Sequence, residues 1–271
     1  MAQISPVTVK KTIDKRQVRQ HFSSHARDYD RYAHVQKTVA EKLCKRLLPL
    51  SGPWRHALEI GCGTGMLSQQ VAGCFPDLPL VLSDLAHGMS QHTQQLQPRS
   101  PVCDADAAAL PFVRASFDLV LSSSVYQWLN DLPNAFSEVA RVLQRDGLLA
   151  LAFFGERTLF ELKESHQWAL AEKLSHGQFF PNLEAVSCAL QNKFEILQLE
   201  SEIEVEWHTG VPALLRNLKK IGAQNASEQR PQGLASRQVM QKMINRYQQQ
   251  YGAEQGIPAT YEVIYLLARG L

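Results

Sequence analysis

The 271-residue chain has few cysteines, and their spacing follows no pattern that is typical of a metal or disulfide site. The five occur singly, at Cys44, Cys62, Cys74, Cys103 and Cys188, without any C-x-x-C pair. A zinc site or a disulfide framework needs paired or regularly spaced cysteines, so we predict neither, and no other metal site. Free thiols are typical of a reducing compartment, and we therefore expect a cytoplasmic protein.

The sequence also has no long apolar segment and no excess of charge of one sign. Its longest apolar run, residues 148–154, is too short to span a bilayer, and no apolar core follows the basic residues near the N-terminus as in a signal peptide. The formal net charge is only +2, which gives no case for nucleic-acid binding. We expect neither a membrane nor a nucleic acid as partner, and we expect a monomer.

Short apolar runs alternate with helical patterns through the middle of the chain. A helical stripe over residues 34–48 is followed by predicted strands at 57–60, 80–83, 101–103, 117–122 and 148–154. This alternation is typical of β-α-β units, which form a parallel sheet with helices on both faces. Two further strands are predicted at 194–207 and 261–268. The pattern as a whole predicts an α/β, Rossmann-like fold with a mainly parallel seven-stranded sheet.

Two segments lie outside this alternation. Residues 1–20 are polar and basic without a clear period, and we predict a flexible arm there. Residues 209–256 are helical in character and rich in Gln and Lys, and they separate the last two predicted strands. We predict a single domain over residues 21–271, with a helical insertion at 209–256 on the substrate side.

A glycine-rich loop follows the first predicted strand. In the segment LEIGCGTG, glycines at 61, 63 and 65 precede a helix that starts at Met66. Glycine allows positive φ and close approach of a ligand, and a helix N-terminus offers free N–H groups. The spacing differs from the dinucleotide fingerprint G-x-G-x-x-G, because position 66 is Met. The loop alone also suits a tight turn in any doubly wound sheet.

Acidic residues follow the next two predicted strands. Asp84 ends the second strand, where a carboxylate can accept hydrogen bonds from both hydroxyls of a ribose, although an Asp there also suits a helix N-cap. Asp106 follows the third strand and could accept a hydrogen bond from an adenine amino group. A nucleoside-containing cofactor fits this arrangement.

Together these motifs resemble the class I S-adenosylmethionine-dependent methyltransferase family. LEIGCGTG, LVLSDL, DAAALPF and FDLVLSS occur in that family's order within residues 57–155. The resemblance implies S-adenosylmethionine as cofactor, with Glu59 at its methionine part, Asp84 at its ribose and Met89 against its adenine ring. The cofactor-binding residues that it implies are Tyr29, Glu59, Gly61, Cys62, Gly63, Gly65, Asp84, Leu85, Met89, Asp106, Ala107 and Ser122.

Further segments resemble one family within that class, the malonyl-[acyl-carrier protein] O-methyltransferases. They are FSSHARDYD at 22–30, YQW at 126–128, LLRNLKKIGA at 214–223 and IPATYEVIY at 257–265. The resemblance implies methyl transfer to the free carboxylate of a malonyl group on acyl-carrier protein or coenzyme A, the step that begins pimeloyl synthesis for biotin. A carboxylate is already ionised at neutral pH, so the site must supply orientation and exclusion of water rather than a general base.

Five residues are candidates for the catalytic side of the site. Tyr29 is expected to cover the methionine end of the cofactor, with helix packing as the alternative role. Tyr126, Gln127 and Trp128 follow the fourth predicted strand, where substrate-facing residues usually lie. Arg157 follows the fifth strand, and its guanidinium could pair with the substrate carboxylate, unless it is a solvated loop residue.

A basic helical face is the candidate partner site. Arg216, Lys219 and Lys220 are spaced i, i+3 and i+4, so they share one face that could dock an acidic carrier protein or simply face solvent. Other acceptors stay open, namely a small molecule such as a quinone precursor. A cofactor-binding assembly factor or a protein-arginine modifier also stays open, whereas Met66 disfavours a dinucleotide oxidoreductase.

Overall fold

The structure is a computed structural model that describes residues 12–50, 52–171, 180–223 and 236–271. A seven-stranded sheet forms its centre, in the order β3-β2-β1-β4-β5-β7-β6. Its strands are β1 (Ala57–Ile60), β2 (Leu80–Asp84), β3 (Val102–Asp104), β4 (Phe117–Ser123), β5 (Leu143–Phe154), β6 (Phe194–His208) and β7 (Ile257–Gly270). The first five strands pair in parallel, and β7 runs antiparallel to β5 and β6. The predicted mainly parallel sheet is confirmed.

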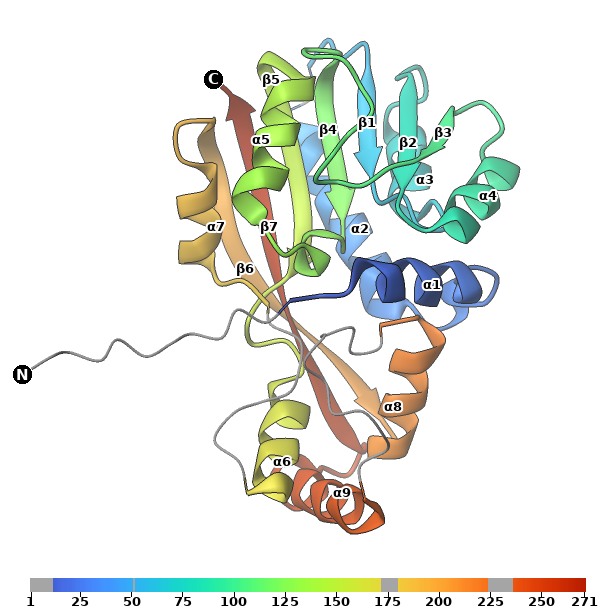
Figure 1. Ribbon diagram of the computed structural model, residues 1–271, viewed down its shortest axis with the longest axis vertical. Coiled ribbons are helices and arrows are strands. Elements are labelled where there is room, and N and C mark those ends of the chain that lie inside the picture. Colours follow the sequence, from blue (N-terminus) through green and yellow to red (C-terminus); the bar gives the residue numbers. More distant parts are fainter. Residues whose placement is uncertain (1–11, 51, 172–179, 224–235) are drawn as a thin grey trace, which may run out of the picture.

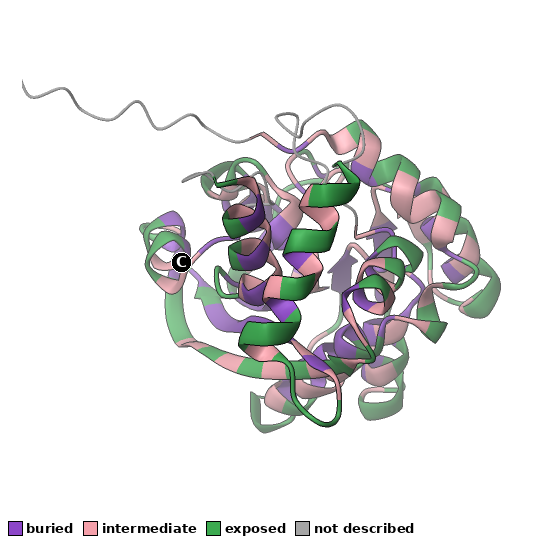
Figure 2. Cartoon of the chain, turned by 90° about the horizontal axis from the view of Figure 1, so that it is seen from below, coloured by how far each residue is buried: buried purple, intermediate pink, exposed green. Residues whose placement is uncertain are grey.

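Helices cover both faces of the sheet. They are α1 (Lys15–His25), α2 (His34–Leu47), α3 (Met66–Cys74), α4 (His87–Leu96), α5 (Leu132–Val142), α6 (Phe160–Leu170), α7 (Leu183–Leu190), α8 (Val211–Lys220) and α9 (Arg237–Tyr251). Apolar residues of α2 and α3 pack in one core cluster, and those of α5 and α7 pack in the other. Figure 2 shows the buried strands enclosed by helices with exposed outer faces. Among the described helices, none is long and apolar enough to cross a membrane.

The N-terminal segment begins its helix earlier than the sequence suggested. The Asp14 side chain accepts hydrogen bonds from the backbone N–H groups of Arg16 and Gln17 and so caps α1, which starts at Lys15. The prediction of a flexible arm is therefore wrong for residues 15–20, while residues 1–11 lie outside the described part. The helix is stabilised by Val18 and Phe22, whose apolar neighbours come from distant parts of the chain.

Two helices lie between β6 and β7, within the segment for which the sequence predicts an insertion, and together they build a second lobe. Strands β6 and β7 extend below the other strands, and α8 and α9 connect them (Figure 1). Helix α6, which follows β5, packs against α9 in the same lobe. The lobe lies beneath the ends at which β1, β2 and β4 finish, and parallel α/β sheets bind their ligands at those ends.

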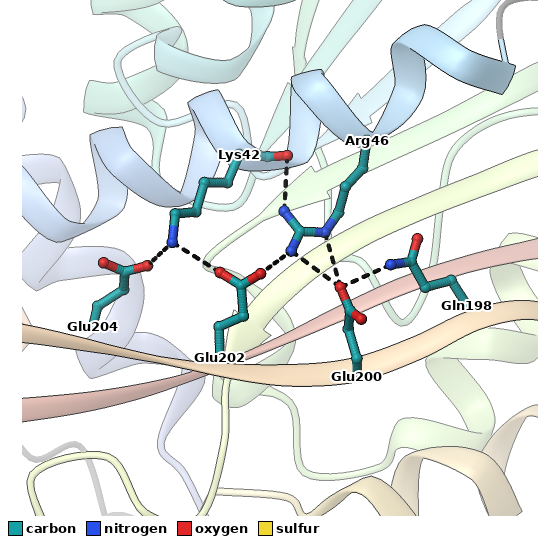
Figure 3. Close-up of polar contacts among 6 residues, drawn as sticks. All are labelled: Lys42, Arg46, Gln198, Glu200, Glu202 and Glu204. Carbon is teal, nitrogen blue, oxygen red and sulfur yellow. Dashed lines mark hydrogen bonds and ion pairs between the residues drawn. The ribbon is translucent and has the colours of Figure 1, made fainter.

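An ion-pair network fastens the long strand β6 to α2 (Figure 3). Lys42 Nζ lies 2.8 Å from Oε2 of Glu202 and also donates a hydrogen bond to Glu204. Arg46 forms ion pairs with Glu200, at 3.1 Å, and with Glu202. Hydrogen bonds to Glu202 and Glu204 raise the pKa of Lys42 above its usual value. Because α2 also reaches the pocket described below, through Gln36 and Ala40, this network connects β6 to the helix that forms part of that pocket.

Candidate active site

A pocket lies at the carboxyl ends of β1, β2 and β4, with α1 as one wall. Most of the residues predicted to bind the cofactor line it: Tyr29, Glu59, Gly61, Cys62, Gly63, Asp84, Leu85, Met89, Asp106 and Ala107. These residues come from five separate stretches of the sequence. The sheet topology brings them together because β1 lies between β2 and β4, so that the loops after these strands meet at one edge.

The glycine loop forms the floor of the pocket. Gly61, Gly63 and Gly65 all have positive φ, at 71°, 55° and 89°. The N–H of Gly61 donates to the carbonyl of Ser83 at 2.7 Å, which fixes the loop to β2. A Cβ added to Gly63 would meet no atom within 4 Å, so its backbone is open to a ligand. This is the geometry that a cofactor lying directly on the main chain needs.

Asp84 holds the loop and still has room for a ligand. One of its carboxylate oxygens accepts the N–H of Gly63 at 2.9 Å, and the other accepts the N–H of Ala86 at 2.7 Å. Each oxygen keeps a second lone pair, which suits a pair of ribose hydroxyls. Burial raises the pKa of Asp84 to about 6, although these hydrogen bonds work in the opposite direction.

Glu59 provides a buried acceptor on the same side. Its side chain is 1% exposed, and its Oε2 has no hydrogen-bond partner within the described part of the chain. Burial is the main reason that its pKa rises to about 8, and the nearby Asp84 adds to the effect. A buried carboxyl oxygen without a partner favours a cationic or N–H-bearing ligand group. The ammonium and sulfonium of S-adenosylmethionine fit this requirement.

Aromatic side chains form another wall of the pocket. Phe22 on α1 packs edge-on against Trp128, with ring centroids 5.5 Å apart, and lies 6.3 Å from Tyr29. All three rings line the pocket. Burial and the neighbouring carboxylates of Asp84 and Asp30 raise the pKa of Tyr29, so its hydroxyl stays neutral. The wall thus offers apolar and π surfaces to a positively charged sulfur.

Asp106 lines the pocket and forms an ion pair. Its Oδ2 is 2.6 Å from Lys15 Nζ on α1, and its Oδ1 accepts the N–H of Ala108 at 2.9 Å. Lys15 and Val18 line the pocket but were missed from the sequence. The Asp14 cap, followed by Val18 and Phe22 at helical spacing, is the signal that could have found them.

Five predicted site residues do not line the pocket. Gly65 caps α3, and the Ser122 hydroxyl donates to the carbonyl of Ile60 at 2.6 Å inside the sheet. Tyr126 is 1% exposed and stacks on Phe136, so it belongs to the core. These three residues lie outside the pocket lining, because their positions are taken up by the start of α3, by the sheet and by the core, respectively.

The other two predicted residues outside the pocket lining are Gln127 and Arg157. Gln127 is buried, and its Nε2 donates to the carbonyl of Ser124 at 2.8 Å. Arg157 donates its backbone N–H to Glu262 at 2.9 Å, at the start of the second lobe. Of Tyr126, Gln127 and Trp128, only Trp128 lines the pocket. The flanking residues Ser123, Ser124, Val125 and Leu129 line it as well.

Comparison with known proteins agrees with this geometry. Residues 58–151 match the model of a methyltransferase domain. A Bacillus halodurans protein described as a methyltransferase has a similar fold, with a TM-score of 0.59 at 15% identity over 84% of this chain and 97% of its own. Geranyl diphosphate methyltransferase in complex with SAM gives a TM-score of 0.53 at 13% identity, over 87% of this chain and 85% of its own. Fold and pocket define an S-adenosylmethionine-dependent methyltransferase.

Relatives with higher sequence identity show to which family within this class of methyltransferases the chain belongs. The malonyl-[acyl-carrier protein] O-methyltransferase of Geobacter sulfurreducens is 41% identical over 93% of this chain and 98% of its own. The malonyl-[acyl-carrier protein] O-methyltransferase of Hahella chejuensis is 34% identical over 93% of this chain and 89% of its own. The chain belongs to the malonyl-[acyl-carrier protein] O-methyltransferase family. It also matches, at 34% identity, 47% of the length of the biotin biosynthesis bifunctional protein BioHC of Teredinibacter turnerae.

The raised pKa values predict a pH-dependent affinity for the cofactor. Glu59 and Asp84 are held partly neutral in the free protein, with pKa values of about 8 and 6, and a cationic cofactor favours their ionised forms. Affinity should therefore rise by roughly tenfold or more from pH 6 to pH 8, with release of protons on binding. Calorimetry in buffers of different ionisation enthalpy measures both effects.

The same two groups give the opposite trend for the stability of the free protein. When the pKa of a carboxyl is higher in the folded than in the unfolded chain, ionisation of that carboxyl destabilises the fold. Its stabilising contribution is therefore complete below the pKa of the unfolded chain and is lost as the pH rises through the pKa of the folded chain. The contribution of Glu59 should thus be lost between about pH 4 and pH 8. Glu59→Gln should flatten the upper part of both pH profiles. An affinity independent of pH in this range would contradict the assignment of Glu59.

Proposed function

We propose that the protein transfers the methyl group of S-adenosylmethionine to the free carboxylate of a malonyl group held as a thioester on acyl-carrier protein. The observation that carries this proposal is the extent of the match to the Geobacter relative, which covers 98% of that protein. The methyltransferase-domain model ends at residue 151, so the likeness continues through the second lobe built from β6, α8, α9 and β7. A shared acceptor is the simplest reason for this continued likeness.

The site needs to supply little chemistry of its own. S-adenosylmethionine, when bound, provides a methyl group on a positively charged sulfur. Glu59 and Asp84 fix its methionine and ribose parts, and the Phe22, Tyr29 and Trp128 wall excludes water beside it. The acceptor is ionised at neutral pH, so one carboxylate oxygen gains the methyl as the bond to sulfur breaks, and no proton moves. Orientation and dehydration of the two groups provide the acceleration.

The product should be a neutral methyl ester, and its place should be biotin synthesis, as the name of the bifunctional relative states for that protein. We also propose that the chain works in the cytoplasm as a monomer, without a membrane or nucleic-acid partner. The five free cysteines support a reducing compartment.

Mass spectrometry of the acceptor tests this function. Malonyl-acyl-carrier protein incubated with enzyme and S-adenosylmethionine should gain one methyl group, which mild base removes as expected for an ester. A parallel reaction with malonyl-coenzyme A shows whether the enzyme methylates the malonyl group faster on acyl-carrier protein or on coenzyme A. Transfer to a quinone precursor or to protein arginine, with malonyl-acyl-carrier protein left unmodified, would overturn the proposal.

Helix α8 is the proposed docking site for the carrier protein. Arg216, Lys219 and Lys220 are all exposed on it, as the sequence suggested. The helix contacts the segment that follows Tyr29, a pocket residue, since Asn217 Nδ2 donates to the carbonyl of Tyr32 at 3.3 Å. Neither α8 nor α9 contains an acidic residue. A positive surface close to the pocket-lining segment favours encounter with an acidic carrier.

Reversing the charge of all three α8 residues to Glu should weaken binding of malonyl-acyl-carrier protein by tenfold or more, roughly 0.5 kcal/mol or more per residue. Affinity for S-adenosylmethionine should not change, because none of the three residues lines the pocket. The matched control reverses Arg237 and Lys242, which are exposed on α9 in the same lobe. Surface plasmon resonance with immobilised carrier measures the effect. Equal losses in both variants would show a general charge effect and remove α8 as the docking site.

A further inference from the structure

Two cysteines from different helices lie next to each other behind the cofactor pocket. Cys44 is on α2, one turn after Ala40, which lines the pocket. Cys74 is the last residue of α3, the helix that follows the glycine loop. Their Sγ atoms are 3.4 Å apart, and both thiols are free. Methyl transfer uses neither of them.

We propose that Cys44 and Cys74 are a thiol modification site, which closes to a reversible disulfide when the protein meets a low-molecular-weight disulfide such as glutathione disulfide. A disulfide has an S–S length of about 2.05 Å, so the two sulfur atoms need to approach by only about 1.4 Å. Cys74 lies where α3 ends, and its side chain can make this movement without unwinding a helix interior.

The difference in exposure sets the order of the two exchange steps. Cys74 is exposed, whereas Cys44 is 2% exposed and out of reach of the oxidant. The thiolate of Cys74 therefore attacks glutathione disulfide first, which forms a mixed disulfide and releases one glutathione. The thiolate of Cys44 then attacks the Cys74 sulfur and releases the second glutathione. Two electrons pass from the protein thiols to the oxidant, and the two protons they lose go to the glutathione thiolates.

The environment of Cys44 makes the second step the slower one. Burial, and then the neighbouring Cys74, raise the pKa of its thiol to about 12. Little of it is thiolate at neutral pH, so closure should accelerate as the pH rises. The adjacent position of the sulfur atoms offsets this, because the attack takes place within one molecule.

The bond would tie together the parts of the chain that form the pocket floor. The loop that it closes, from Cys44 to Cys74, contains β1, Gly61–Gly65 and the whole of α3. Closing a loop of this size lowers the entropy of the unfolded chain and stabilises the fold. Because the native positions barely change, we expect an oxidised protein with a higher unfolding midpoint and unchanged affinity for S-adenosylmethionine.

The test uses the full-length protein and glutathione disulfide. After oxidation, alkylation in denaturant and digestion, the peptides that contain Cys44 and Cys74 should be linked, and dithiothreitol should separate them. The unfolding midpoint of the oxidised protein should rise by several degrees. Cys188→Ser, which removes another exposed thiol, should behave like the wild type. Cys74→Ser should lose both the link and the rise.

One pattern of products would overturn the proposal. In that pattern, even oxidation at alkaline pH would give Cys74 only as its mixed disulfide with glutathione. All of Cys44 would then be found alkylated, because it had stayed a free thiol during the oxidation. An unchanged midpoint in a protein that does carry the link would equally contradict the stabilising role. Both readouts are independent of methyl transfer, so they stand whether or not malonyl-acyl-carrier protein is the acceptor.

Discussion

Replacing Gly61 with alanine is expected to abolish cofactor binding and to destabilise the protein by roughly 2–5 kcal/mol. The glycine has a φ of 71°, and a Cβ there would lie 2.1 Å from Cγ2 of Val125. Val125 belongs to the turn after β4 that also lines the pocket, so neither side can move away without disturbing the site. Urea unfolding and titration with S-adenosylmethionine measure the two effects.

Alanine substitutions at two other glycines distinguish the effect of backbone strain on stability from the loss of the cofactor site. Gly73 lies in α3, and a Cβ there meets no atom within 4 Å, so Gly73→Ala should be neutral or stabilising by up to about 1 kcal/mol. Gly63→Ala should keep the fold at a cost of about 1–2 kcal/mol for its positive φ, but its methyl group would occupy cofactor space. If Gly61→Ala bound cofactor as tightly as Gly73→Ala, the proposed floor of the pocket would be wrong.

Substituting Asp84 with asparagine should lower affinity for S-adenosylmethionine by about 10- to 150-fold, equivalent to roughly 1.5–3 kcal/mol for hydrogen bonds to a charged group. Both carboxylate oxygens already accept backbone N–H groups, from Gly63 and Ala86. An amide NH₂ would replace one acceptor and face one of these donors, so the loop would loosen while the ribose lost its anionic partner. Calorimetric titration of the variant gives the change.

Asp104 offers a matched control for this substitution. It is the last residue of the neighbouring strand β3, and its exposed carboxylate pairs with His87 rather than with the loop. Asp104→Asn should bind S-adenosylmethionine with nearly the affinity of the wild type. Equal losses at positions 84 and 104 would indicate that overall negative charge attracts the cofactor, and the specific role of Asp84 would have to be abandoned.

The cofactor side of the pocket was predictable because its signals are local. A glycine loop between a strand and a helix needs only neighbouring residues to be recognised, and Asp84 marks the end of the next strand. Once alternating strands and helices imply a parallel sheet, these loops must meet at one edge. The sequence patterns therefore bring Glu59, Gly61 and Asp84 together, and in the structure the three residues line one pocket.

The remaining errors share another cause, which is the direction of a side chain after its strand has ended. Tyr126 and Trp128 lie in the same short turn, yet one packs in the core and the other reaches the pocket. Arg157 was expected at the pocket mouth, but the chain leaves β5 towards the second lobe there. Helix α1 has a local signal in its Asp14 cap, but the contact of its Phe22 with Trp128 arises only through the tertiary fold.

The most direct test of this account is a calorimetric titration of the purified protein with S-adenosylmethionine and with its demethylated product, S-adenosylhomocysteine. Both should bind in a one-to-one complex, and Asp84→Asn should weaken both. If neither ligand gives a binding signal while a nicotinamide dinucleotide does, the pocket is not a methyl-donor site, and the function proposed for the chain falls with it.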